Sequence, residues 1–229
     1  MFIKGLQKTT LLDYPGKVAC TIFTGGCNFR CPFCHNASLV TRIDSEERID
    51  EDELFSYLEK RKGILDGVCI TGGEPLLQPD IEAFCQKIKK LGLLIKLDTN
   101  GSFPSKLRSL LDSNLIDYIA MDVKNSKKEY AKTCGGHEFP SNIEESIRII
   151  RSASVPYEFR TTVVRELHTK ESIRELAEWI AGADRYFLQG FIDSGDLIES
   201  NYSAYSEAEM RELLAIARVY VPTAELRGV

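Results

Sequence analysis

Three cysteines lie within eight residues of one another, in the stretch Cys27-Asn-Phe-Arg-Cys31-Pro-Phe-Cys34. The chain has seven cysteines among its 229 residues, so a random placement would give such a group with a probability below roughly 1%. An odd number of cysteines does not suggest the disulfide framework of a secreted protein. Three thiolates on one short loop can instead surround a metal centre.

Two kinds of metal centre are compatible with this group. Structural zinc takes four closed ligands, but the candidate fourth ligand, His35, directly follows Cys34, and no second Cys-x-x-Cys pair occurs downstream. An iron–sulfur cluster with three protein thiolates leaves one iron open for a substrate or cofactor. The spacing therefore favours an open iron–sulfur cluster, with structural zinc and inert thiols as the alternatives.

The rest of the chain predicts alternating strands and helices that position this loop. Strands are predicted at 17–23, 67–71, 93–98, 118–123, 157–164 and 186–191. Helices are predicted at 51–62, 81–91, 106–111 and 173–180, together with two that open at capping boxes formed by Asn142 with Glu145 and by Ser206 with Glu209. Six such β/α units indicate an α/β fold with a parallel sheet, doubly wound or closed toward a barrel. We expect one domain over residues 17–229, preceded by an N-terminal hairpin or extension over residues 1–16.

Polar residues occur where each predicted strand ends. In chain order these are the cysteine loop; Gly72, Gly73 and Glu74; Asp98 to Gly101; Asp122 and Lys124; Arg160 and Thr161; and Gln189. Ligands of parallel α/β folds bind at the carboxyl ends of the strands. We therefore expect these groups to form a single large site.

Composition limits the classes of partner. The chain has 29 Lys and Arg against 34 Asp and Glu, a net charge of −5, and 43% hydrophobic residues, which is typical of a globular protein rather than a disordered chain or a coiled coil. No apolar run approaches the ~18 residues of a membrane span, and no secretory signal is visible. The acidity argues against a nucleic-acid partner. A cytoplasmic protein is predicted.

Several motifs resemble those of one enzyme superfamily. Cys27-x-x-x-Cys31-x-x-Cys34 after a first strand resembles the radical S-adenosylmethionine (SAM) superfamily. Cys31-Pro-Phe-Cys34-His-Asn, Gly72-Gly73-Glu74-Pro, Asp98-Thr-Asn100-Gly and Met-Asp122-Val123-Lys124 resemble the activating enzymes of glycyl radical enzymes. The opening Gly-Leu-Gln-Lys-Thr-Thr-Leu-Leu-Asp-Tyr-Pro-Gly of residues 5–16 is similar to activating proteins assigned to anaerobic ribonucleoside-triphosphate reductase.

This resemblance implies a fold, cofactors and a reaction. The fold would be a partial (β/α)6 barrel. One [4Fe–4S] cluster would be held by Cys27, Cys31 and Cys34, and its fourth iron would bind SAM. Reductive cleavage of SAM would give a 5′-deoxyadenosyl radical that takes hydrogen from a glycine of the partner, most plausibly anaerobic ribonucleotide reductase. Reduced flavodoxin or ferredoxin would supply the electron, and no catalytic residue beyond the cluster ligands is implied.

The resemblance also implies a set of SAM-binding residues. They are Phe33, Cys34, His35, Gly72, Gly73, Glu74, Asp98, Asn100, Asp122, Val123, Lys124, Arg160 and Gln189. Structural alternatives exist for several of them. The glycine pair and Asn100-Gly101 are also typical of turns, and Asp122 with Lys124 is compatible with a salt bridge at the rim. Arg160, if buried, requires an anionic partner, for which the SAM carboxylate or the target peptide backbone is a candidate.

The histidines and the other four cysteines are not expected to bind a metal or to act in catalysis. We expect His35 to contact adenine through its backbone, and His137 and His168 to lie on the surface. Cys20, Cys69, Cys85 and Cys134 are expected to be small buried residues.

One departure from the related activating enzymes stands out. Those of formate-lyase type carry a histidine after the sixth strand that helps to hold SAM, whereas residues 188–193 here contain none and offer Gln189 instead. Two other functions stay open: a radical SAM synthase acting on a small molecule of deazaguanine type, and a metal-stabilised binding module without catalysis.

Overall fold

The computed structural model describes residues 1–43, 48–136 and 140–229 and contains one eight-stranded sheet. The strands are β1 (Ile3–Thr10), β2 (Ala19–Thr24), β3 (Gly67–Gly72), β4 (Leu94–Thr99), β5 (Tyr118–Asp122), β6 (Tyr157–Val163), β7 (Tyr186–Gly190) and β8 (Glu225–Arg227). They are hydrogen-bonded in chain order. All neighbouring pairs from β2 to β8 are parallel, and β1 lies antiparallel to β2 at one edge.

The sheet is curved but open. In the described part of the chain β1 and β8 form its two edges and are not paired with each other. The prediction of a partly closed parallel α/β sheet is therefore confirmed, with a seventh parallel strand beyond the six predicted. That strand, β8, has three residues, too few for an apolar pattern to indicate it. The expected division at residue 16 stays a prediction.

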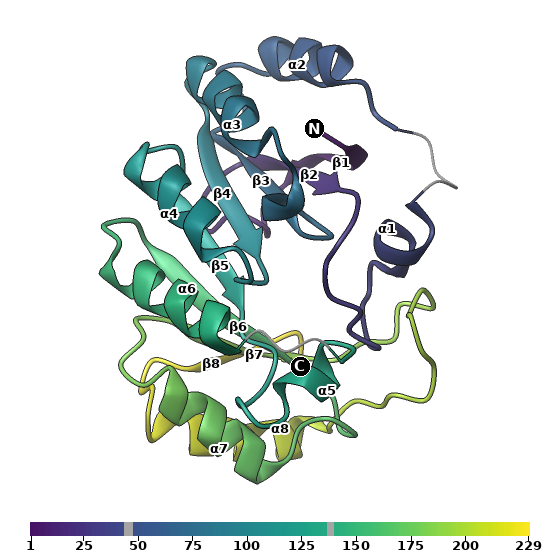
Figure 1. Ribbon diagram of the computed structural model, residues 1–229, viewed down its shortest axis with the longest axis vertical. Helices are drawn as coiled ribbons and strands as arrows, with labels where there is room; N and C mark the ends of the chain where they lie inside the picture. The colour runs from purple at the N-terminus through teal and green to yellow at the C-terminus, as the bar shows by residue number, and fades with distance from the viewer. Residues whose placement is uncertain (44–47, 137–139) are drawn as a thin grey trace.

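Helices connect the strands, and the longer ones cover the outer side of the sheet (Figure 1). They are α1 (Ala37–Thr41), α2 (Glu51–Lys60), a short 3-10 helix η2 (Pro75–Leu77), α3 (Ile81–Lys90), α4 (Pro104–Asp112), α5 (Tyr130–Thr133), α6 (Pro140–Ser152), α7 (Lys170–Trp179) and α8 (Glu207–Arg218). Among the residues described, none of the helices is both long enough and apolar enough to cross a membrane.

Local sequence explains most helix boundaries. The capping box of Ser206 with Glu209 is present at the start of α8 and confirms that prediction. The box predicted from Asn142 is wrong, because α6 already begins at Pro140 and proline is well suited to a first helical position. The side chain of Asn142 instead donates to the carbonyl oxygen of Ser102 at 3.0 Å.

The core lies between the helices and the outer face of the sheet. Helix α3 shows the pattern: Ile81, Phe84, Cys85 and Ile88 are buried along one face, as their helical spacing predicts. Because side chains alternate between the two faces of a strand, the other face of each strand points to the concave side of the sheet. That concave face carries polar side chains, and they form the site.

Candidate metal and cofactor site

A cavity of about 430 Å³ opens on the concave side of the sheet, at the carboxyl ends of the strands. It is lined by Gln7, Asp13, Thr21, Phe23, Cys27, Phe29, Cys31, Phe33, Cys34, His35, Asn36, Val40, Cys69, Thr71, Gly72, Gly73, Asp98, Thr99, Asn100, Asp122, Lys124, Arg160, Thr162 and Gln189. The three cluster cysteines and the SAM-binding residues implied by the resemblance line this cavity, except Glu74 and Val123. Of the other strand-end residues, Gly101 and Thr161 do not line it. The structure therefore brings the strand-end groups into one place, as expected.

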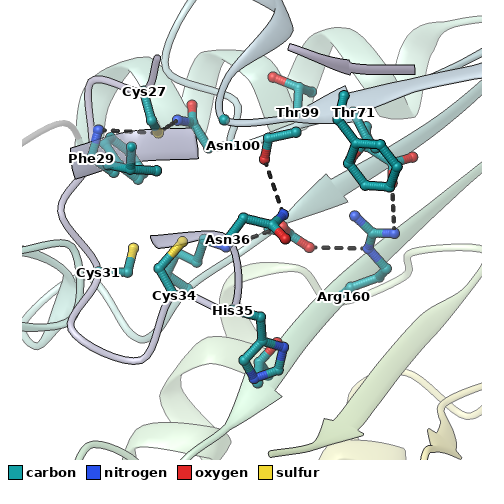
Figure 2. A pocket seen from close by; sticks show the side chains of 18 of the residues that line it. Cys27, Phe29, Cys31, Cys34, His35, Asn36, Thr71, Thr99, Asn100 and Arg160 are labelled. Atoms are coloured by element: carbon teal, nitrogen blue, oxygen red, sulfur yellow. Dashed lines mark hydrogen bonds and ion pairs between the residues drawn. The ribbon is translucent and has the colours of Figure 1, made fainter. Parts of the chain in front are cut away.

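The three cysteines come from the loop between β2 and α1. Figure 2 shows the sulfurs of Cys31 and Cys34 close to each other, while Cys27 lies further along the loop beside Asn100. Within the described residues, no three His, Cys, Asp or Glu side chains converge so as to hold one ion. Zinc needs ligands that meet at about 2.3 Å from one point, whereas the thiolates of a cluster each bind a different iron. The spread of the thiols suits a cluster better than a single ion.

Burial keeps two of these thiols neutral in the absence of a metal. It raises the pKa of Cys27 to about 12 and also raises the pKa of Cys34. Cys31 is hydrogen-bonded to the thiol of Cys134, a cysteine that the sequence indicated only as a small buried residue. The backbone supports this contact, since the Arg30 amide donates to the Cys134 carbonyl at 3.0 Å. Loading a metal therefore has to displace protons from thiols.

The glycine pair after β3 lets two loops touch. A Cβ on Gly73 would lie 1.9 Å from the carbonyl oxygen of Gly26, and one on Gly72, whose φ is +117°, would lie 2.3 Å from the Thr24 nitrogen. The amide of Glu74 donates to the same Gly26 oxygen at 2.8 Å. The close approach seen here is to the cysteine loop, and a close approach to SAM stays a prediction.

Glu74 is buried and does not line the cavity, and its assignment as a SAM-binding residue stays a prediction. Its carboxylate accepts from the Thr99 hydroxyl at 2.8 Å, the Asn100 amide at 2.7 Å and the Leu76 amide at 3.0 Å. Burial raises its pKa to about 7 despite these donors. Glu74 thus ties the loop after β3 to the loop after β4.

Charged side chains on β4, β5 and β6 neutralise one another. Arg160 lies opposite Asp122 in the register of β5 and β6, with its Nε 3.0 Å from that carboxylate and its Nη1 3.1 Å from Asp98. Lys124 pairs with Asp122 at 3.0 Å, and Lys96 pairs with Asp98. The anion that Arg160 requires is therefore supplied by the chain itself, and the salt-bridge alternative for Asp122 and Lys124 is present.

These pairs shift the pKa values in the cavity wall. Burial alone would raise the pKa of Asp122, but Arg160 and Lys124 outweigh it and hold the pKa well below its usual range. Burial likewise opposes the charge on Lys124, yet Asp122 and the neighbouring thiols raise its pKa. Asp98, Asp122, Lys124 and Arg160 consequently stay charged around neutral pH. A zwitterionic ligand can find both signs of charge in this wall.

Of two further residues in the predicted SAM-binding set, His35 lines the cavity and Val123 does not. The ring of His35 lines the cavity and packs on Phe191 with 5.5 Å between ring centroids. Burial, helped by Lys124, lowers its pKa, so the ring is neutral at neutral pH. Val123 is fully buried outside the cavity lining, and its amide donates to the Arg160 carbonyl at 2.9 Å. Its assignment as a SAM-binding residue stays a prediction.

The expectation that His168 lies on the surface is wrong. Its ring is fully buried, with Nε2 2.8 Å from the Lys124 carbonyl oxygen and Nδ1 3.0 Å from the Val164 amide nitrogen. It therefore fixes the backbone of Lys124. His137, the other histidine expected on the surface, lies outside the described residues.

Several cavity residues were not predicted from the sequence, although the strand pattern indicates them. Thr71 and Cys69 lie two and four residues before Gly73, and Thr162 lies two residues after Arg160. The period of two along a strand places each of them on the same face as its predicted neighbour. Gln7 and Asp13 had no such signal, because their place in the cavity depends on the antiparallel pairing of β1 with β2.

Comparison with known proteins fits this site. A family model for the radical SAM superfamily matches residues 21–180. A protein of Methanocaldococcus jannaschii, provisionally named a glycyl-radical enzyme activating enzyme, is 31% identical over 235 residues, covering 99% of this chain and 96% of its own length. The pyruvate formate-lyase-activating enzyme of Clostridium pasteurianum is 28% identical over 184 residues, or 78% and 75% of the two chains.

A solved structure shares the fold. Streptococcus suis SuiB bound to its precursor peptide SuiA superimposes with a TM-score of 0.71 at 18% identity, over 91% of this chain and 48% of SuiB. The chain belongs to the radical SAM superfamily, an enzyme class whose members use a [4Fe–4S] cluster and SAM. Within the superfamily it belongs with the glycyl-radical enzyme activating enzymes.

Proposed function

We propose that this chain activates anaerobic ribonucleoside-triphosphate reductase, by generating a radical on a glycine of that enzyme. The observation that carries the proposal is the single cavity that contains all three loop cysteines and the polar ends of β3 to β7. We further propose that the protein works in the cytoplasm and receives its electron from reduced flavodoxin or ferredoxin.

In this proposal Cys27, Cys31 and Cys34 hold a [4Fe–4S] cluster. When bound, the reduced cluster and SAM together supply a strongly oxidising carbon radical that can take hydrogen from a glycine. The chain orients these groups and excludes water from them, while the cofactors provide the bond-breaking chemistry. Three thiols on one loop leave one iron free for SAM.

The charged wall provides the complement to SAM. Asp98 and Asp122 offer carboxylates to the cationic end of a zwitterion, and Lys124 offers an ammonium to its carboxylate. Their mutual ion pairs with Arg160 hold these groups ready before a ligand arrives, so little reorganisation is needed on binding. Gln189, on β7, stands where related activating enzymes carry a histidine and offers an amide in its place.

The choice of partner is supported by the N-terminal motif. Residues 5–16 resemble activating proteins assigned to the anaerobic reductase, and both Gln7 and Asp13 within this motif line the cavity. The hydroxyl of Thr21 donates to the Asp13 carboxylate, which holds Asp13 at the cavity wall. A motif that reaches the cavity is suitably placed to contact a substrate peptide.

The test is anaerobic reconstitution with iron and sulfide, followed by reduction, addition of SAM and addition of the reductase. We expect 5′-deoxyadenosine and a glycyl radical signal on the reductase in electron paramagnetic resonance spectra. Cys31→Ala should abolish both products. Cys85→Ala is the matched control, because Cys85 is equally buried but lies on α3, outside the cavity lining.

Other results would point to the other two functions. 5′-Deoxyadenosine without a radical on any glycyl radical enzyme would favour a synthase acting on a small molecule. Protein that binds zinc, assembles no cluster and cleaves no SAM would favour a binding module. Either result would overturn the proposed activity.

A further inference from the structure

The thiol of Cys27 is approached by two hydrogen-bond donors (Figure 2). The backbone amide of Phe29 lies 3.3 Å from its sulfur, and the side-chain nitrogen Nδ2 of Asn100 lies 3.8 Å from it. Phe29 belongs to the same loop, but Asn100 comes from the loop after β4, 73 residues away in the chain. A distant loop thus contributes a donor to a proposed cluster ligand.

The orientation of the Asn100 amide is determined by its neighbours. Its oxygen Oδ1 accepts from the backbone amide of Ser102 at 2.9 Å and from the Ser102 hydroxyl at 2.6 Å. A backbone amide can only donate, so the atom facing it has to be the oxygen. The nitrogen therefore has to face the other way, toward Cys27 and toward the Asn28 oxygen at 3.1 Å.

The surroundings also hold Asn100 in place. The residue is 6% exposed, and its backbone amide donates to the buried carboxylate of Glu74 at 2.7 Å. Both acceptor positions of its side chain are occupied by Ser102, and its two donor hydrogens are directed to Asn28 and Cys27. All four side-chain positions are therefore occupied by Ser102 and by residues of the cysteine loop.

We infer that Asn100 is a positioning residue that sets the reduction potential of the cluster through its N–H···S contact with Cys27. This rests on the cluster assigned above to Cys27, Cys31 and Cys34, but not on the identity of the partner enzyme. One-electron reduction adds negative charge that is shared with the thiolate sulfurs. A donor at sulfur stabilises the reduced state more than the oxidised state, so it raises the potential.

The inference predicts the effect of removing the donor. In Asn100→Asp the acceptor side facing Ser102 is kept, while an oxygen replaces the nitrogen at Cys27. Asn100→Ser removes the donor without adding charge. The midpoint potential of the cluster, measured by anaerobic spectroelectrochemical titration, should become more negative in both variants. A tenfold loss in the reduction equilibrium, which equals about 59 mV for one electron, is the expected size in Asn100→Ser, and the added charge should make it larger in Asn100→Asp.

Ser102→Ala is the matched control. It removes the hydroxyl that bonds Asn100 Oδ1, but the Ser102 backbone amide still fixes the same amide orientation. Its potential should stay close to that of the unaltered protein.

Two results would overturn the inference. One is an intact cluster in Asn100→Ser with the potential of the unaltered protein. The other is loss of the cluster in both Asn100 variants, because Asn100 would then act on cluster assembly. Failure of the unaltered protein to assemble any cluster would instead count against the proposed function. The two failures are therefore distinguishable, and the titration needs no partner enzyme.

Discussion

At the scale of single residues, the side chains proposed as ligand contacts mostly contact one another. Arg160 binds Asp98 and Asp122, and Glu74 binds the loop that follows β4. Glu74 is buried and the others are half-buried at strand ends, and a buried polar group without a partner costs about 1–3 kcal/mol. The site therefore needs internal partners to exist at all, whether or not a ligand is present.

Gly73→Ala should weaken the site by separating two loops. The new Cβ would lie 1.9 Å from the Gly26 oxygen, and because that atom belongs to the backbone, the cysteine loop has to move. We expect a loss of stability of about 1–3 kcal/mol and weaker SAM binding by calorimetry. Gly5→Ala is the control, since its Cβ would meet only the Phe23 side chain, at an ordinary 3.4 Å. Equal SAM affinity in the two variants would contradict the prediction.

Glu74 should make the protein less stable as the pH rises through its folded pKa. Burial raises that pKa from 4.5 to about 7, so between these values the folded state binds more protons than the unfolded state. Its contribution to stability therefore falls from about pH 4.5 to about pH 7, by on the order of 3 kcal/mol. Urea unfolding at about pH 5 and about pH 8 should show this loss in the unaltered protein but not in Glu74→Gln. The same pH dependence in both proteins would show that Glu74 does not titrate in this way.

At the scale of elements, the cysteine loop is held by the loops that follow other strands. The loop after β3 bonds Gly26 through the Glu74 amide, and the segment after α5 bonds the Arg30 amide through Cys134. The segment after β7 reaches across as well, with the Glu199 amide 2.9 Å from the Pro32 oxygen. Because the segments after several strands fix one loop, substitutions within those strands should alter the position of the cysteines.

Arg160→Met should destabilise β4, β5 and β6 together. It leaves the carboxylates of Asp98 and Asp122 without their shared cation, and breaking a buried pair costs about 3–5 kcal/mol. Arg160 lowers the pKa of both acids, so this stabilisation is present above their unfolded pKa and lost as the pH falls. The difference in unfolding free energy between the two proteins should thus shrink in acid.

The control for Arg160→Met is Arg174→Met. Arg174 pairs with Glu171 and Glu178 on the exposed surface of α7, where such pairs contribute less than about 1 kcal/mol. Equal destabilisation by the two changes would contradict the role given to Arg160.

At the scale of the whole molecule, the open sheet leaves β8 as an edge strand beside β7. Its Arg227 contacts the carboxylate of Glu158 on β6 with two N–H groups, at 2.8 Å and 3.2 Å. It also lies over the ring of Phe187 at 3.8 Å. The three-residue strand β8 thereby supplies the cation that neutralises the Glu158 carboxylate, two strands away in the sheet.

Arg227→Ala should cost about 3 kcal/mol of unfolding free energy, because Glu158 is 1% exposed and would keep, among the described residues, only the Tyr118 hydroxyl as a hydrogen-bond partner. Thermal and urea denaturation measure this loss. Glu225→Ala alters an exposed residue of the same strand and should change stability by less than about 0.5 kcal/mol. A similar small effect of Arg227→Ala would mean that Glu158 finds another partner.

The sequence by itself determined the order of the elements and predicted the chemistry of the cysteine loop. Helical spacing, strand patterns and capping boxes involve residues that are close together in the sequence. The amphipathic α3, the capping box of α8 and the six longer parallel strands were therefore predictable. The family resemblance added the cofactors, and the superfamily match supports it.

Only the tertiary structure decided how the polar residues are used. The partners of Arg160, Glu74, His168 and Asn100 come from segments about 25 to 70 residues away. Local sequence patterns do not predict which polar residues become partners when the strands pair and the loops pack together. The short β8 and the place of Asp13 in the cavity depend in the same way on sheet pairing, which is set by packing across the whole molecule.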